Sequence, residues 1–312
     1  MEAIVERART QFSPVEKQMV KILITGAGGL LGHVLLQQTG HLGYDVCALY
    51  HEHKPEGDRA IRVDVTDCKA VKDCIQREKP SIVINTASMT DVDLCEREPE
   101  LAMRVNGTAA GFLAEACARV KAFLVQISTD YVFDGSRGNY NENDTPAPVN
   151  QYASSKLLGE RLVADYENSC IARSSVVYGC GRSYRANFGT WLYDKISKGE
   201  QVKVVTDQFA SPTLNTNLAS MAMELAERRT RGIVHVAGAT RASRYEFAMR
   251  LAEELHADTS LLTPVDSGSA GWIARRPLDS SLNVSKATEL LNNKPVSLHE
   301  GIREFVRQLH KN

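Results

Sequence analysis

Short apolar runs alternate with longer, partly polar segments from Lys21 to Ser174. The runs contain neither Pro nor Gly, which predicts strands buried on both faces of a sheet. They lie at 21–25, 44–50, 60–63, 81–86, 122–128 and 170–173. The segments between them predict helices at 29–39, 67–77, 100–119 and 151–167. Regular alternation of this kind predicts a parallel sheet covered by helices on both faces.

Beyond Ser174 the pattern changes to shorter elements. It predicts helices near 187–198, 215–229, 243–256 and 298–310, and strands at 201–205 and 232–237. The second of these strands is expected to return to the main sheet. The last helix carries five apolar side chains on one face, so we expect it to dock. They are Leu298, Ile302, Phe305, Val306 and Leu309.

A glycine-rich turn joins the first predicted strand to the first predicted helix. It contains Gly26, Gly28, Gly29 and Gly32. Glycines let the backbone bend tightly and approach a pyrophosphate, while the free N–H groups and the dipole of the helix favour negative charge. Glycines also mark ordinary turns, but the strand before and the helix after favour a dinucleotide site.

The expected fold is therefore α/β, a Rossmann-type doubly wound parallel sheet with a smaller mixed C-terminal substrate lobe. Residues 19–173 would form the dinucleotide-binding domain, to which 215–238 would return. Residues 174–214 and 239–312 would form the substrate-binding lobe. Residues 1–18 are polar and are expected to be a poorly ordered extension.

Composition excludes several classes of function. The chain has 312 residues, enough for a large core, and its 37 Lys and Arg balance 38 Asp and Glu. Near-zero net charge gives no bulk argument for binding nucleic acid or a membrane surface. No apolar run reaches the roughly 18–20 residues of a membrane span, and no signal-peptide core precedes Met19. We therefore expect a cytoplasmic protein.

Cysteine usage points the same way. The chain has seven cysteines, an odd number, and no CxxC pair. Most lie within apolar patterns, so we expect buried free thiols in a reducing cytoplasm rather than disulfides or a zinc site. No dense carboxylate cluster demands a metal ion, and we expect none.

Tyr152 and Lys156 begin the helix predicted at 151–167. Four residues apart on a helix, the phenol and the ammonium lie on one face. A tyrosine has an unperturbed pKa near 10, and a neighbouring Lys⁺, helped by the charge of a nicotinamide, is expected to lower it toward the working range of an acid–base catalyst. A packed tyrosine and a solvated lysine remain the alternative. Thr129 follows the fifth strand at its carboxyl end, where open α/β sheets bind ligands.

These motifs resemble the extended short-chain dehydrogenase/reductases. They are Gly26-x-x-Gly29-x-x-Gly32, Asp64-Val65, Asn85-Thr-Ala87, Ser128-Thr129 and Tyr152-x-x-x-Lys156, in that family's order. Longer stretches resemble the dTDP-4-dehydrorhamnose reductases in particular. They include NTASMTDVDLCE (85–96), STDYVFDG (128–135), YASSKLLGE (152–160), DQFASPT (207–213) and ARRPLDSSL (274–282). The resemblance runs from about Met19 to the C-terminus.

The resemblance implies reduction of a 4-keto nucleotide sugar by NADPH or NADH. Tyr152 would be the general acid, Lys156 would tune it and bind the nicotinamide ribose, and Thr129 would orient the carbonyl. Asn106 would stand in a relay behind Lys156. The implied cofactor-binding set is Gly26, Gly28, Gly29, Leu30, Leu31, Tyr50, His51, Asp64, Val65, Ala87, Ser88, Tyr152 and Lys156. The implied substrate-binding set is Thr129, Val176, Asn187, Gln208, Pro212 and Arg276, the last four being open to plain turn or surface roles.

Two departures from the family pattern bear on specificity. The family commonly has Trp in R-T-S-W-V-Y-G, where this chain has Val176. Without that ring the sugar pocket loses an apolar wall, which puts dTDP-rhamnose specificity in doubt. NAD enzymes usually place an acid at the end of the second strand. Here the strand ends in Tyr50 and is followed by His51-Glu-His-Lys54, which favours NADP while NAD stays possible.

Other functions remain open at this level. A nucleotide-sugar dehydratase usually carries Asp-Glu after the Ser/Thr, whereas this chain has Asp130-Tyr131. An epimerase is a nearer alternative. A regulatory subunit resembling that of methionine adenosyltransferase would bind NADP and act by contacting a partner. A homodimer is possible, and some relatives are described as using Mg²⁺ between subunits.

Overall fold

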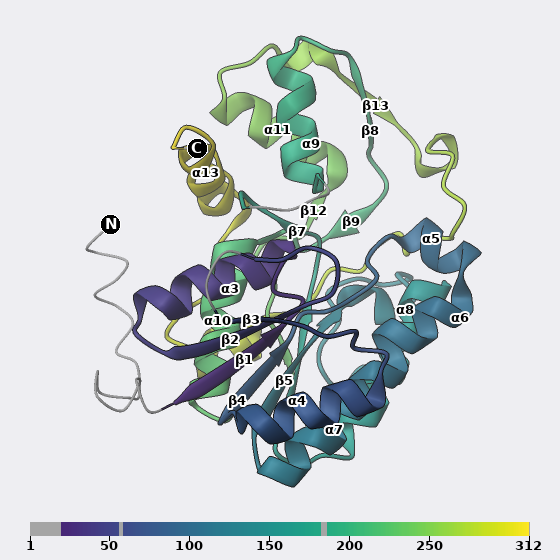
Figure 1. Cartoon of the computed structure of the whole chain (residues 1–312). Coiled ribbons are helices and arrows are strands. Elements are labelled where there is room, and N and C mark those ends of the chain that lie inside the picture. Colours follow the sequence, from purple (N-terminus) through teal and green to yellow (C-terminus); the bar gives the residue numbers. More distant parts are fainter. Residues whose placement is uncertain (1–19, 56–58, 182–185, 312) are drawn as a thin grey trace.

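A seven-stranded parallel sheet forms the centre of the molecule (Figure 1). The computed structural model describes residues 20–55, 59–181 and 186–311, so the predicted extension at 1–18 lies outside the described residues. The strands are β1 (Lys21–Thr25), β2 (Asp45–Tyr50), β3 (Ala60–Arg62), β4 (Ile82–Asn85), β5 (Phe123–Thr129), β6 (Ser169–Ser174) and β11 (Gly232–His235). The six strands predicted between Lys21 and Ser174 are confirmed.

The order of the strands is β11-β6-β5-β4-β1-β2-β3, and all neighbours pair in parallel. The chain winds outward through β2 and β3, then crosses back to β4 beside β1. This reversal between β1 and β4 is the switch point at which doubly wound sheets open a crevice. The Rossmann-type fold is therefore confirmed, and the strand predicted at 232–237 joins the main sheet as β11.

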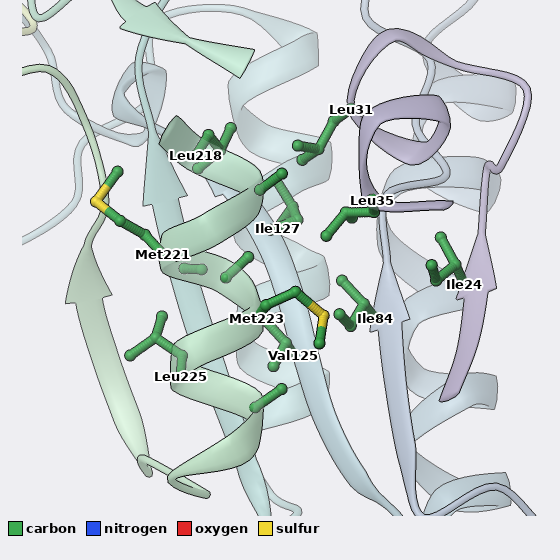
Figure 2. Packing of buried hydrophobic residues seen from close by; sticks show 14 of the residues in the cluster. Ile24, Leu31, Leu35, Ile84, Val125, Ile127, Leu218, Met221, Met223 and Leu225 are labelled. Carbon is green, nitrogen blue, oxygen red and sulfur yellow. The ribbon is translucent and has the colours of Figure 1, made fainter. Parts of the chain in front are cut away.

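Helices cover both faces of the sheet, because its strands are apolar on both sides. On one face, α3 (Leu30–His41) and α10 (Asn215–Glu227) pack against β1, β4 and β5. Figure 2 shows Leu218, Met223 and Leu35 of these helices directed toward the strands. On the other face lie α4 (Cys68–Glu78), α7 (Ala109–Val120) and α8 (Gln151–Ala164).

The helix predicted at 100–119 is interrupted. The structure has α6 (Pro99–Ala102), a π-helical turn η1 (Met103–Thr108) and then α7. Helix α8 lies so close to this turn that a Cβ at Gly159 would be 2.4 Å from the carbonyl oxygen of Asn106. Such π-helical turns often mark functional sites, and here the turn directs Asn106 toward the carboxyl edge of the sheet.

A smaller group of elements lies at one end of the sheet (Figure 1). It has its own apolar cluster, built from α9 (Phe188–Ser197), β8 (Val202–Val205), α11 (Arg244–Glu254), β13 (Leu262–Val265) and α13 (Leu298–Leu309). Leu298, Ile302, Phe305 and Val306 are buried there, which confirms that the last helix docks. The exact residues at which this part begins and ends stay a prediction.

Several short elements were missed in the sequence. They are α5 (Val92–Arg97), β7 (Val177–Tyr178), β9 (Phe209–Ala210), β10 (Thr213–Leu214), β12 (Ala242–Ser243), β13 and α12 (Ser285–Leu290). β7 pairs with β10, and β9 with β12. Two-residue strands have no periodicity of their own, because only the partner defines them.

A buried ion pair ties α8 to β6. Arg173 donates to Glu160 from Nε at 2.9 Å and from Nη2 at 2.7 Å, and both side chains are almost fully buried. Ser128 donates to the same carboxylate at 2.5 Å. The pair therefore holds the helix that carries Tyr152 and Lys156 against the ends of β5 and β6.

We expect Arg173→Met to lower the free energy of unfolding by about 3–5 kcal/mol, because it leaves Glu160 buried without its counter-charge. Arg307→Met is the matched control: it removes an exposed pair with Glu304 and should cost less than about 1 kcal/mol. Urea unfolding followed by circular dichroism measures both. Equal losses in the two variants would contradict this assignment.

Candidate active site

The glycine turn approaches neighbouring backbone so closely that side chains are excluded. Gly26 has φ +64°, and a Cβ there would lie 2.6 Å from the backbone nitrogen of Ala87, across the switch point. A Cβ at Gly28 would lie 2.2 Å from the carbonyl oxygen of His53, and one at Gly32 would lie 2.3 Å from that of Gly26. The turn thus packs tightly against β4 and against the loop after β2.

Gly29 is the N-cap residue of α3 and supplies no side-chain cap. The N-terminus of this helix borders a cavity of about 830 Å³, lined by Gly26, Gly28, Gly29, Leu30 and Leu31 among others. A helix N-terminus without a capping side chain presents N–H groups and a positive dipole to an anion. The residues present fit the pyrophosphate of a dinucleotide.

The far side of the same cavity is lined by Tyr50, His51, Asp64 and Val65. His51 Nε2 lies 3.8 Å from Asp64 Oδ2, and Arg62 Nε donates to the His51 carbonyl at 3.0 Å. Burial works to raise the pKa of Asp64, but hydrogen bonds from Thr66 and the charges of His51 and Arg104 outweigh it and lower that pKa. Asp64 is therefore a charged acceptor at this end of the cavity.

Tyr152 and Lys156 stand at the other end, one turn apart on α8. Asn150 caps this helix by accepting from the Ala153 N–H at 2.8 Å. The Thr129 hydroxyl donates to Asp130 Oδ1 at 3.1 Å and lies close enough to the Tyr152 phenol to lower its pKa in part. Thr129, Tyr152 and Lys156 all line the cavity. Lys156 Nζ donates to the Ile127 carbonyl at 2.8 Å. The structure thus brings together the three residues that the sequence nominates for catalysis.

The electrostatics differ from the expectation. The sequence argument has Lys156, together with a nicotinamide charge, lowering the pKa of Tyr152. With the chain's own groups alone, burial raises the pKa of Tyr152, partly opposed by the nearby Thr129 hydroxyl. Burial also lowers the pKa of Lys156 to about 8, because desolvation outweighs the charge of Glu160. Both groups lose water on the same face of the helix, so burial dominates. The phenol is therefore held in its protonated form.

Asn106 organises the floor of this region. Its Oδ1 accepts from Ser88 Oγ at 2.9 Å and from the Met89 N–H at 2.8 Å. Its Nδ2 donates to Met89 O and to Ser155 Oγ, both at 3.0 Å. Asn106 thus joins the lining residue Ser88 to α8, and its contact with the helix passes through Ser155 beside Lys156. Ala87, next to Ser88, also lines the cavity.

The predicted substrate residues fall into two groups. Thr129, Val176 and Asn187 line the cavity. Val176 has φ +37°, which is rare for a β-branched residue and marks a strained backbone. The Asn187 side chain caps α9 by accepting from Thr190, and it donates to Gly179 O at 2.9 Å, so its polar atoms are already engaged.

Gln208, Pro212 and Arg276 are not among the lining residues. Gln208 is buried behind the wall and donates to Tyr131 Oη at 2.9 Å. Arg276 Nη1 lies 2.9 Å from Asp93 Oδ1, an ion pair that ties the C-terminal segment to α5. A substrate role for these three stays a prediction; Gln208 and Arg276 have bonded partners in the structure, and Pro212 is buried.

Two residues of the wall were missed in the sequence. Tyr131 lies edge-on to Tyr152, with ring centroids 6.0 Å apart. Arg244, the first residue of α11, also lines the cavity. Ser243 and Glu246 form a capping box that places the start of this helix. Nothing in the local sequence pattern shows that the N-terminus of this helix borders a cavity, because the residues of the opposite wall lie more than a hundred positions earlier in the sequence.

A doubly wound sheet with a glycine turn at its switch point and a Tyr–Lys pair on the adjoining helix defines the extended short-chain dehydrogenase/reductases. The chain belongs within them to the RmlD substrate binding domain family, whose model matches residues 20–311. Among relatives, the probable low-salt glycan biosynthesis reductase Agl14 of Haloferax volcanii is 37% identical over 84% of this chain and 89% of its own. The dTDP-4-dehydrorhamnose reductase of Mycobacterium tuberculosis is 37% identical over 84% of each chain.

A relative of another kind is methionine adenosyltransferase 2 subunit beta of Xenopus tropicalis, 32% identical over 97% of this chain and 95% of its own. Among solved structures, a dTDP-4-dehydrorhamnose reductase of Bacillus anthracis in complex with NADP has a TM-score of 0.82 and 32% identity, covering 92% of this chain and 99% of its own. The family thus contains both reductases and a subunit of another enzyme.

Within the described ranges, no helix is both long and apolar enough to cross a membrane. The same residues contain no group of three or more His, Cys, Asp or Glu side chains suited to a metal ion. Cys47, Cys74, Cys95, Cys117 and Cys170 are buried free thiols.

The lowered pKa of Lys156 is testable by competitive acetylation with acetic anhydride and mass spectrometry across pH. We expect Lys156 to become reactive with a midpoint near pH 8, because burial favours its neutral form. The control is Lys69, whose pKa is raised by its hydrogen bond to Asp73 and which should titrate well above that pH. A shared midpoint for the two lysines would contradict the assignment.

Proposed function

We propose that this chain reduces a 4-keto nucleotide sugar with NADPH or NADH. The observation that carries the proposal is that Thr129, Tyr152 and Lys156 line the same cavity as the glycine turn, with Tyr152 and Lys156 one helical turn apart on α8. A carbonyl oxygen received between the two hydroxyls would lie beside a proton donor. The reductases among the relatives support the reaction class.

The chain's own groups supply the acid half of the reaction. A bound nicotinamide would supply the hydride that the carbonyl carbon receives. As the C=O bond becomes an alcohol, Tyr152 gives its proton to the oxygen, and Thr129 holds that oxygen in place. A general acid must begin protonated, and burial keeps the phenol so. Near pH 7, below its pKa of about 8, Lys156 is charged and stabilises the phenolate that remains.

The cofactor would lie along the cavity from the N-terminus of α3 to the end of β2. The glycine turn would hold its pyrophosphate, Asp64 and Val65 would meet the adenine, and Ala87 and Ser88 would flank the chain of the cofactor. NADP is favoured because β2 ends in Tyr50 with no acid, and because His51 stands beside the ribose position. The relative solved with NADP supports this preference.

The pocket should accept a wider range of sugars than the pocket of a reductase that has a tryptophan at the position of Val176. A valine there leaves room against the strained backbone turn. Dehydration fits less well: Tyr131 replaces the second carboxylate, and Asp130 accepts from Ser175 at 2.7 Å and Ser280 at 2.5 Å. Its carboxylate is thus committed to structural bonds.

A second candidate is a cofactor-binding regulatory subunit. The relative named methionine adenosyltransferase 2 subunit beta aligns with more of this chain than do the reductases above. Such a protein would bind NADP without turning over a sugar. Stable copurification with a synthetase, and no oxidation of NADPH with a panel of keto sugars, would favour this candidate.

Tyr152→Phe is expected to lower kcat about 10²- to 10⁴-fold by removing the proton donor. The measurement is loss of NADPH absorbance with a dTDP-4-keto-6-deoxyhexose. NADPH affinity, measured by fluorescence, should stay within about twofold, since the hydroxyl acts on the carbonyl. The control, Tyr166→Phe, removes a hydroxyl bonded to Ala122 O outside the cavity and should keep its activity. Full activity in Tyr152→Phe would refute the acid role.

Tyr50→Asp tests cofactor choice. A carboxylate at the end of β2 would accept bonds from a ribose diol and repel a 2′-phosphate, so the NADPH-to-NADH ratio of kcat/KM should fall about tenfold or more. Tyr50→Asn is the matched control, because it removes the same ring without adding a negative charge and should change the ratio much less. An unchanged NADPH-to-NADH ratio in Tyr50→Asp would mean that the end of β2 does not discriminate between the two cofactors.

A further inference from the structure

Arg244 is a cation on the cavity wall that the reaction above does not use. It begins α11, on the part of the molecule opposite the glycine turn. Among the described lining residues, Lys and Arg are represented by Lys156 and Arg244 alone. Lys156 is engaged with the Ile127 carbonyl and stands beside Tyr152 on α8. Arg244 is thus the strong cation available to a ligand on the other wall.

The guanidinium of Arg244 is held in place from one side. Its Nε donates to Gln208 Oε1 at 3.2 Å, and its backbone N–H donates to Gln208 O, also at 3.2 Å. Its Cζ lies 4.7 Å from the centroid of the Phe188 ring. No carboxylate of the described residues forms an ion pair with it. The two terminal nitrogens therefore keep donors for a ligand, in the fork geometry that suits phosphate.

A line of contacts relates Arg244 to the reacting position. Gln208, which orients Arg244, also donates to Tyr131 Oη at 2.9 Å. The Tyr131 ring in turn lies edge-on to the ring of Tyr152 at 6.0 Å. Arg244 is thus linked to the proton donor Tyr152 through the side chains of Gln208 and Tyr131. In a nucleotide sugar whose C4 carbonyl meets Tyr152, the diphosphate is the anionic group that follows across the sugar ring.

Arg276, the arginine that the sequence nominates for the substrate, is differently placed. It forms an ion pair with Asp93 at 2.9 Å, donates to Ala274 O at 3.0 Å and stacks on Trp272. It does not line the cavity. Its charge is already neutralised by a partner that joins two segments of the chain.

We propose that Arg244 binds the diphosphate of the nucleotide-sugar substrate, with Gln208 as the residue that positions its guanidinium. This inference rests on the proposed function for the identity of the substrate. It assigns nucleotide affinity to the start of α11 rather than to Arg276. It also gives buried Gln208 a role behind the pocket wall instead of direct contact with the sugar.

The test measures binding without turnover. Calorimetry with dTDP as the probe should show that Arg244→Gln weakens binding about 10- to 100-fold, the worth of a charge-assisted pair of hydrogen bonds. Arg244→Lys should lose less, since it keeps the charge but not the fork. Arg241→Gln is the matched control: Arg241 lies three residues earlier, pairs with Asp279 and stacks on Phe209 outside the cavity. Its dTDP affinity should equal that of the wild type.

NADPH binding by each variant, measured in the same way, checks folding and keeps the two proposals apart. Wild-type protein that binds dTDP and NADPH but reduces no keto sugar would overturn the reductase and leave this inference standing. Unchanged dTDP affinity in Arg244→Gln would overturn the inference, as would an equal loss of NADPH affinity. The inference would also be overturned if Arg276→Gln lost affinity for dTDP while Arg244→Gln kept it. It would likewise be overturned if Arg244→Gln weakened the binding of a UDP-uronic acid but not the binding of dTDP. No binding of dTDP or UDP by wild-type protein would overturn it too.

Discussion

The close approach of α8 to the π-helical turn at Asn106 is the contact on which the site depends. Gly159 permits it, because any side chain there would meet the Asn106 carbonyl. At the next residue of α8, the Glu160–Arg173 pair fastens the helix to β6. Between these two attachments the helix has one orientation, and Tyr152 and Lys156 consequently face the carboxyl edge of the sheet. Catalytic geometry here is a product of backbone packing.

A second constraint crosses the sheet just below the crevice. Thr25 donates to Asn85 at 2.5 Å, and Asn85 donates to Gln126 at 2.7 Å, joining β1, β4 and β5 through buried side chains. Buried polar groups that are fully paired specify one arrangement, since any shift leaves them unpaired. The glycine turn follows β1, and Thr129 is the last residue of β5. The chain of bonds therefore fixes the positions of these two parts of the site relative to each other.

The sequence predicts those parts of the molecule that depend on periodicity. Continuous apolar runs identify the parallel strands, and the glycine spacing identifies the turn, because both are local properties. The π-helical turn could not be predicted, since its cause is the partner helix at Gly159. Arg244 and Tyr131 could not be predicted as residues of the cavity wall for a similar reason. Neither stands out in the local sequence pattern, and each lines the cavity only because of tertiary packing. The pKa of Tyr152 also depends on burial, which spacing does not report.

The strained turn at Val176 has a consequence for how such pockets change. Its backbone is held by pairing of β7 with β10 and by the bond from Thr213 N to Val176 O at 3.1 Å. Because the main chain is anchored on both sides, the side chain at this position can be exchanged for a larger or smaller one while the surrounding loops stay where they are. These contacts thus hold the turn against a backbone strain of the order of 1–3 kcal/mol. Under the proposed function, a substitution at Val176 would therefore change the wall that faces the sugar without moving the loops around it.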